Sequence, residues 1–248
     1  MPTLAQHYTV IVVDYRGMGS SSRPADGYDK KTMAGDLEQL VSQLGYKKVN
    51  IAGHDIGSQL AYAFAANYPA STSKVVMMDI PHSDESLLSW PLLPAHNTFG
   101  DKLDPAHPYP WWFAFHQVKG LPEKLLEGRA GLEQDWIFKY LTKYEDAITP
   151  LDRAVYARAY NSADAIRAGN AWYQSFTQDI IDDKAYARLQ MPVLGIGGAS
   201  SGFEWLKAVM SQKAVNFTPL KLDSGHFLPE EQPEAVASAI IDFLGKGD

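Results

Sequence analysis

Cysteine is absent from all 248 residues of the chain, which excludes disulfide bonds, cysteine-bound zinc and a thiol nucleophile. Long hydrophobic runs are also missing, since no stretch approaches the roughly 18 apolar residues of a membrane-spanning helix. The first residues, MPTLAQHYTV, lack the basic region followed by an apolar region that marks a signal peptide. We therefore expect a soluble, cytoplasmic protein with no membrane partner.

Positive charge is scarce, because 22 Lys and Arg residues stand against 29 Asp and Glu residues, for a net charge of −7. Nucleic-acid binding needs clustered Lys and Arg, so we expect no nucleic acid as a partner. The histidines show no spacing with carboxylates that is typical of a metal site. No dinucleotide fingerprint is complete either, so we expect neither a metal nor a cofactor.

Short, apolar, β-branched runs bounded by turn residues recur along the chain, and their near-continuous hydrophobicity predicts parallel strands buried on both faces. These runs are YTVIVVD (8–14), KVNIAGHD (48–55), KVVMMDI (74–80) and MPVLGIGG (191–198), and VNFTPLKLDSGHF (215–227) follows the last of them. Helical patterns separate or follow them at KKTMAGDLEQLVSQLG (30–45), SQLAYAFAANYP (58–69) and EAVASAIIDFLGKG (234–247). The alternation predicts a doubly wound α/β fold.

This alternation stops between residues 82 and 186, where the sequence is rich in aromatic residues, contains several prolines and shows helical patterns. We interpret 82–186 as a helical cap inserted, after the third predicted strand, into one α/β core made of residues 1–81 and 187–248. A single domain with an insertion is ordinary at this length.

The segment Gly53-His54-Asp55-Ile56-Gly57 lies where an apolar strand runs into a helix. A tight turn there lifts its central residue above the sheet, the geometry of the nucleophile elbow usually written G-x-S-x-G. A carboxylate at a helix N-terminus is favoured in its ionised form. The alternative is that Asp55 only caps the helix.

Two further residues follow strands at the same edge of the predicted sheet. Asp79 ends the run VVMMD, and His226 stands in LDSGHF just before the last helix. Open α/β sheets place their sites at the carboxyl ends of the strands. The strand at 191–198 is followed by ASSGFEW, which offers only the distant Glu204, so Asp79 is the better candidate to orient His226. The order nucleophile, acid, histidine is that of the α/β-hydrolases.

Several motifs together resemble the epoxide hydrolase branch of the α/β-hydrolases, a branch that also holds haloalkane and haloacetate dehalogenases. They are DYRGMGSSSRP (14–24), GHDIG (53–57), MMDIP (77–81), PWWFAFHQVKGLPEKLLEGR (110–129), WYQSF (172–176) and SGHFLPEE (224–231). The resemblance implies that Asp55 attacks an sp³ carbon and forms an alkyl ester. His226, oriented by Asp79, then activates the water that hydrolyses this ester, and the backbone N–H of Ile56 is one oxyanion donor.

The resemblance also implies donors on the cap for the oxygen that leaves when an epoxide opens. Tyr173 matches a cap tyrosine of this kind. Trp112 and His116 are candidates for binding the leaving oxygen or a halide, although an indole N–H does not give up its proton readily. His54 is the elbow residue beside the nucleophile and a candidate for substrate contact. Core packing is the alternative for these aromatic residues.

A small apolar epoxide is thus the expected substrate, and a halogenated compound is the alternative. Haloacetate dehalogenases of this kind place arginines just after the nucleophile, where this chain has Ile56 and Gln59. Haloalkane dehalogenases usually place tryptophan directly after it, and Ile56 departs from that too. A rival of another class is a module that binds a small ligand without chemistry. The substrate, its stereochemistry and the oligomeric state, a homodimer included, stay open.

Relatives in this family begin with further strands and an H-G-x-P loop that supplies a second oxyanion donor, and neither is visible here. In the family order a missing strand would lie between the predicted strands at 8–14 and 48–55, which leaves two edges unpaired. Three explanations are open: a shortened version of an active enzyme, strands that pair directly, and an inactive homologue. We favour the first. One oxyanion donor is worth on the order of 10²–10³ in rate, so we expect activity of the complete chain and weak or no turnover from these 248 residues alone.

Overall fold

The computed structural model describes residues 1–96 and 100–245. In chain order the elements are α1 (Pro2–Ala5), α2 (Lys30–Gln43), β1 (Val49–His54), α3 (Ile56–Asn67), η1 (Pro69–Ser71), β2 (Thr72–Met78), η2 (Glu85–Ser89), α4 (Trp111–Gln117), α5 (Leu121–Leu126), α6 (Ala130–Leu141), η3 (Glu145–Ala147), α7 (Pro150–Tyr160), α8 (Ala163–Gln174), α9 (Phe176–Asp183), β3 (Val193–Gly198), α10 (Phe203–Lys213), β4 (Phe217–Leu222), α11 (Leu228–Glu231) and α12 (Pro233–Gly245). The η elements are single 3-10 turns.

The four strands form one parallel sheet in the order β1-β2-β3-β4. Its two central strands are the most apolar, and β3 is buried along its whole length. Parallel neighbours need crossover connections, which the helices between the strands supply. The carboxyl ends of all four strands therefore meet at one edge, as the sequence predicts.

Side chains of β2 alternate between two helical layers, because successive residues of a strand point to opposite faces. Val75 and Met77 pack in one core with α3 and α10. Val76 and Met78 pack in a second core with α12. The sheet is thus covered on both faces, which explains its continuous hydrophobicity.

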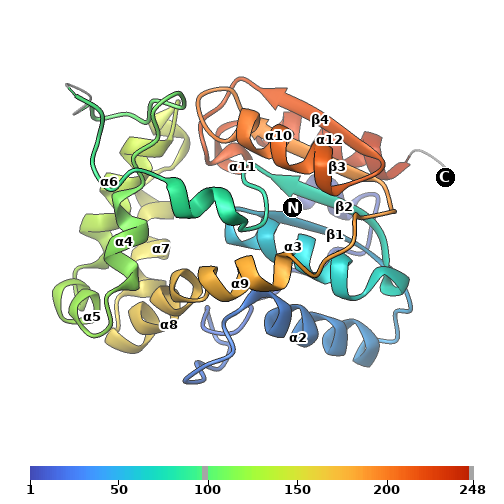
Figure 1. Ribbon diagram of the computed structural model, residues 1–248, viewed down its shortest axis with the longest axis horizontal. Helices are drawn as coiled ribbons and strands as arrows, with labels where there is room; N and C mark the ends of the chain where they lie inside the picture. The colour runs from blue at the N-terminus through green and yellow to red at the C-terminus, as the bar shows by residue number, and fades with distance from the viewer. Residues whose placement is uncertain (97–99, 246–248) are drawn as a thin grey trace.

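Helices α4 to α8 gather at one end of the molecule, beside the edge of the sheet where the strands end (Figure 1). They belong to the segment between β2 and β3, in which the described residues form helices and turns but no named strand. Helix α9 returns the chain toward the sheet (Figure 1). The expected place of the insertion, after a third strand, is wrong. Because residues 8–14 form no strand, the insertion follows β2, the second strand of the sheet. The division into a core and a cap at residues 82 and 186 stays a prediction.

The strand predicted for residues 8–14 is wrong. Residues 9–15 have no assigned strand or helix, and Ile11 and Val12 are exposed. A β-branched run becomes a strand only when a neighbour accepts and donates its backbone hydrogen bonds, and within the described residues no segment pairs with it. The edge of the sheet is therefore β1, where Asn50 and Ala52 are exposed.

Helix ends follow the predicted signals. Gly45 follows Leu44, the C-cap residue of α2, and has φ of +82°, as expected of a residue that terminates a helix. The last helix, predicted for 234–247, spans Pro233–Gly245, and the remainder of that prediction lies outside the described residues. Among the described residues, no helix is both long enough and apolar enough to cross a membrane.

Candidate active site

Asp55 occupies a strained turn between β1 and α3. Its φ of 53° and ψ of −124° are conformations that few non-glycine residues adopt. Its side chain makes no capping hydrogen bond to α3, so the interpretation of Asp55 as a simple helix cap is wrong. The side chain is 42% exposed, which leaves the carboxylate accessible. Asp55 thus has the geometry of a nucleophile elbow.

The two glycines around Asp55 are not equivalent. A Cβ atom on Gly53 would lie 1.8 Å from the carbonyl oxygen of Gly57, so the turn closes only without a side chain there. A Cβ atom on Gly57 would meet no atom within 4 Å. The turn therefore requires glycine at residue 53 but not at residue 57.

Asp79 lies directly after β2 and is completely buried. Its carboxylate accepts hydrogen bonds from Ser201 Oγ at 2.7 Å, from the backbone N–H of Gly198 at 3.0 Å and from that of Gly202 at 3.2 Å. Burial alone would raise the pKa of Asp79, but the hydrogen bond from His226 and these other donors outweigh burial and lower it. The loop after β3 therefore supplies hydrogen-bond donors to Asp79.

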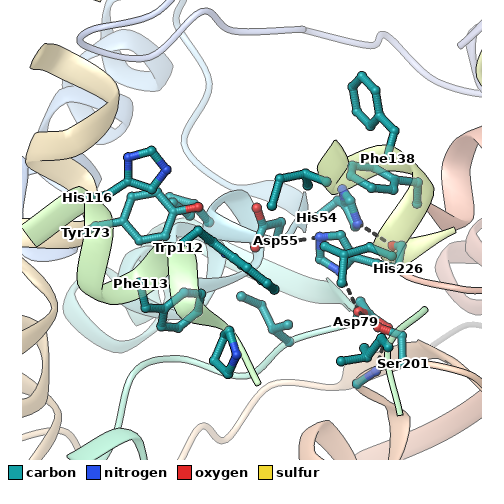
Figure 2. Close-up of a pocket in the computed structure, with 18 of the residues that line it drawn as sticks. His54, Asp55, Asp79, Trp112, Phe113, His116, Phe138, Tyr173, Ser201 and His226 are labelled. Carbon is teal, nitrogen blue, oxygen red and sulfur yellow. Dashed lines mark hydrogen bonds and ion pairs between the residues drawn. The ribbon is translucent and has the colours of Figure 1, made fainter. Parts of the chain in front are cut away.

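His226 connects Asp79 to Asp55 (Figure 2). Its Nδ1 lies 2.6 Å from Asp79 Oδ2, and its Nε2 lies 3.8 Å from Asp55 Oδ1. Burial opposes a charge on the ring, yet the hydrogen bond with Asp79 and the charges of Asp79 and Asp55 raise the pKa of His226 to about 9. The structure thus brings together the three residues that the sequence singled out.

His54 holds the loop that carries His226. Its Nε2 lies 2.7 Å from the carbonyl oxygen of His226, which requires Nε2–H as the donor, and the two rings stand 4.7 Å apart. Burial, followed by the charge of His226, lowers the pKa of His54. A neutral His54 donating to this carbonyl supports His226 from behind, in addition to lining the cavity described next.

A cavity of about 800 Å³ opens over Asp55, and most of its lining is apolar or aromatic. Tyr173, from α8, lies across this cavity with its hydroxyl turned toward Asp55 (Figure 2). Burial, and then the charges of Asp55 and Glu133, raise the pKa of Tyr173 well above its ordinary value. The hydroxyl therefore keeps its proton at neutral pH.

Trp112 and His116, both from α4, lie on opposite sides of Tyr173. The Trp112 indole hydrogen-bonds to the Tyr173 hydroxyl, with the N–H as the donor. The His116 ring stacks on the Tyr173 ring with 4.7 Å between the ring centres (Figure 2). His116 also hydrogen-bonds through Nδ1 to Asn170 Oδ1 at 2.7 Å, and its Nε2 lies 3.2 Å from Glu133 Oε1. Trp112 and His116 both line the cavity, as the sequence predicts for groups that contact a substrate, and His116 also stacks on Tyr173.

A protein-family model described as alpha/beta hydrolase fold matches residues 1–204. The chain belongs to this family. The α/β-hydrolase interpretation of the sequence is therefore confirmed, together with the expectation of an enzyme.

Relatives of this α/β-hydrolase include two groups that the sequence motifs suggested. A soluble epoxide hydrolase of Corynebacterium sp. (strain C12) is 29% identical over 98% of this chain and 83% of the relative. A fluoroacetate dehalogenase of Burkholderia sp. is 26% identical over 98% of this chain and 80% of the relative. Among solved structures, the epoxide hydrolase CorEH without ligand superposes with a TM-score of 0.83 at 29% identity, covering 98% of this chain and 84% of that one.

Sequence reasoning missed a buried carboxylate that ties this α/β-hydrolase's histidine loop to the inserted helices. Oε2 of Glu231 accepts the backbone N–H groups of Lys143 at 2.8 Å, Tyr144 at 3.0 Å and Gly225 at 3.1 Å. His226 follows Gly225 directly, so Glu231 fixes the approach to that histidine. Glu231 lies in the motif SGHFLPEE, but nothing in the sequence indicates that residues 143 and 144 lie across from it.

Tyr160 was also missed. It ends α7 and lines the same cavity as Asp55 and Tyr173. Burial, and then the charges of Asp55 and Asp14, raise the pKa of Tyr160 to about 12. The position lies in a helical segment whose many aromatic residues carry no motif that separates lining from packing. The described residues contain no group of histidine and acidic side chains able to hold a metal ion.

Substitution of the two elbow glycines should separate their roles. Gly53→Ala places a methyl group against the Gly57 carbonyl, and we expect a loss of about 3 kcal/mol or more in the free energy of unfolding. Gly57→Ala enters open space at the start of α3, and we expect a change of no more than about 1 kcal/mol. Urea unfolding of both variants measures this, and equal losses would contradict the geometry.

The raised pKa of His226 predicts a pH dependence of stability. The folded pKa of about 9 exceeds the ordinary value of 6.5, so the contribution of His226 is complete below pH 6.5 and disappears as the pH rises through 9. We therefore expect the unfolding free energy to fall between those values, and to fall less in His226→Gln. Denaturant titrations at both ends of this range test the prediction, and parallel losses in the two proteins would contradict it.

Proposed function

We propose that this α/β-hydrolase opens epoxides to vicinal diols through an alkyl ester on Asp55. The observation that carries the proposal is the placement of an accessible aspartate opposite a protonated tyrosine, across a mainly apolar cavity. A carboxylate nucleophile suits attack on an sp³ carbon, and a neutral phenol suits an oxygen that leaves as an alkoxide. A small apolar epoxide and water are the proposed reactants, and the chemistry needs no cofactor.

In the first step, Asp55 attacks one carbon of the epoxide and the bond from that carbon to the ring oxygen breaks. The electron pair of this bond goes to the oxygen, which takes the proton of Tyr173. The Trp112 indole N–H donates to the Tyr173 oxygen and stabilises the phenolate that results. The product of this step is a hydroxyalkyl ester of Asp55.

In the second step, His226 takes a proton from a water molecule that attacks the ester carbonyl. The backbone N–H of Ile56, at the start of α3, donates to the oxygen that becomes negative. Ester formation removes the charge of Asp55, one of the charges that raise the pKa of His226. The pKa of His226 therefore falls when the ester forms, so that the ring loses its Nε2 proton to solvent and can then act as a base.

The tetrahedral intermediate then releases the diol and restores Asp55. The water's first proton passes from His226 to the departing oxygen. Its second proton returns to Tyr173. Asp79 supports the positive charge that His226 carries in between, because its buried carboxylate lies 2.6 Å from Nδ1.

A dehalogenase of similar mechanism is the second candidate, since a fluoroacetate dehalogenase is among the relatives. The described residues that line the cavity include no Lys or Arg to bind a substrate carboxylate. Gln59 is buried and its amide oxygen accepts from Ser83 Oγ at 3.1 Å, so it does not replace an arginine. These features favour an uncharged substrate over a haloacetate.

Trapping of the ester tests the proposal. In His226→Gln the first step proceeds but the base of the second step is missing. We expect mass spectrometry of this variant, after incubation with styrene oxide, to show the protein mass increased by one whole epoxide. Peptide mapping should place the increase on Asp55.

The control is the double variant Asp55→Ala, His226→Gln, which should keep its unmodified mass. An adduct that persists in this control would show modification elsewhere. An adduct from chloroalkanes but not from epoxides would identify a dehalogenase. Failure of every substrate to modify folded His226→Gln would favour a module that binds ligands without chemistry.

A further inference from the structure

An ion pair without any solvent contact lies between α2 and the junction of α8 with α9. The side chains of Lys30 and Asp179 are both 0% exposed, and Lys30 Nζ lies 2.8 Å from Asp179 Oδ2. Burial of two charges costs several kcal/mol per ion, which their attraction repays only with good geometry and further hydrogen bonds. The presence of such a pair therefore does not show that it stabilises the fold. The segments that the pair holds together indicate its role more directly.

The ammonium group of Lys30 is surrounded by groups of the α8–α9 junction. Nζ donates to Ser175 Oγ at 3.2 Å and to the backbone carbonyl of Trp172 at 3.3 Å, and it lies 5.1 Å from the ring centre of Phe176. The Trp172 carbonyl belongs to the last turn of α8, whose carbonyls lack partners within the helix. A positive charge there is also favoured by the helix dipole. Lys30 thus caps the end of α8.

Asp179 completes the connection from the other side. Its Oδ1 accepts the backbone N–H of Lys30 at 2.7 Å, while Oδ2 binds the ammonium. One carboxylate therefore holds both the first backbone amide of α2 and the side chain that caps α8. The hydroxyl of Ser175 lies 2.9 Å from the carbonyl of Tyr28 and adds a second link to the segment before α2.

The turn that is held in this way carries Tyr173. It follows Trp172, whose carbonyl binds Lys30, and it precedes the C-cap residue Ser175 by two positions. Helix α2 packs on α3 through Met33 and Phe64, among others, and α3 begins directly after Asp55. A chain of rigid contacts thus runs from Asp55 through α3 and α2 to Tyr173.

We infer that Lys30 and Asp179 form a positioning pair that sets the location of the Tyr173 hydroxyl relative to Asp55. The inference rests on the proposed function, because Tyr173 is the proton donor only in the ring-opening step. Neither Lys30 nor Asp179 lines the cavity, so the pair acts through Tyr173 and not on the substrate. In hydrolysis of the ester, His226 is the base and Asp79 orients it, and Tyr173 only recovers its proton afterwards. The rate of hydrolysis should therefore not depend on the pair.

The test replaces the pair by apolar residues of similar size, in the double variant Lys30→Met, Asp179→Leu. Replacement of both partners avoids leaving one charge buried alone, which is the costly change. In single-turnover experiments with styrene oxide, acid quenching and mass spectrometry give the rates at which the ester forms and disappears. We expect ester formation to slow by on the order of 10- to 100-fold, the effect of a small displacement of a reacting group. Ester hydrolysis should stay within about 3-fold of its original rate, within the context-dependent variation of such effects.

A double-mutant cycle with Tyr173→Phe decides whether the effect passes through the tyrosine. If it does, Lys30→Met, Asp179→Leu should change the rate of ester formation little in Tyr173→Phe, which already lacks the hydroxyl. Equal fold-changes with and without the hydroxyl would overturn the inference. So would equal losses in both chemical steps, which would indicate a general structural role.

Lys213→Met is the matched control, since it removes a partly buried lysine that pairs with Asp183 near the end of α9. Both chemical steps should stay close to their original rates in this variant. Should the unsubstituted protein form no ester at all, the proposed function fails. If the unsubstituted protein forms the ester and the Lys30→Met, Asp179→Leu variant forms it equally fast, only the positioning inference fails.

Discussion

The turn at Asp55 is the constraint on which the remainder of the site depends. A parallel strand must pass into a helix with one residue in a strained conformation, and the closeness of Gly53 to the Gly57 carbonyl permits no side chain at residue 53. Because of this turn, the carboxylate of Asp55 makes no hydrogen bond to the helix and lies above the ends of the strands. Every other functional group is placed relative to this point: His226 from the loop after β4, Asp79 from the end of β2 and Tyr173 from α8.

The buried charge of Asp79, close to this turn, is compensated by its own set of hydrogen-bond donors. The carboxylate of Asp79 has no contact with solvent, yet it accepts hydrogen bonds from the histidine, a serine hydroxyl and two backbone amides. These donors favour its ionised form and so raise the pKa of His226. The buried carboxylate of Asp79 thereby controls the protonation of His226.

The inserted helices contribute the opposite wall, and they are connected to the α/β layers by polar contacts within an otherwise apolar interface. Glu231 joins the histidine loop to the end of α6 through three backbone amides. Lys30 and Asp179 join α2 to the α8–α9 junction. Apolar surfaces can slide with little loss of energy, whereas hydrogen bonds to buried charges have narrow geometry. Such contacts suit a site whose two halves come from distant parts of the chain.

By itself, the sequence determined the α/β class and singled out Asp55, Asp79 and His226 as residues that lie together at one edge of the sheet, because buried strands, elbow glycines and residues after strand ends leave local patterns. It misplaced a strand at residues 8–14, since a β-branched run forms a strand only beside a partner, and partners are a property of the fold. The tertiary structure alone decided that His116 stacks on Tyr173 and that Lys30 is buried with Asp179, 149 positions away in the chain. Local patterns record what each residue prefers, whereas contacts between distant segments exist only once the chain has packed.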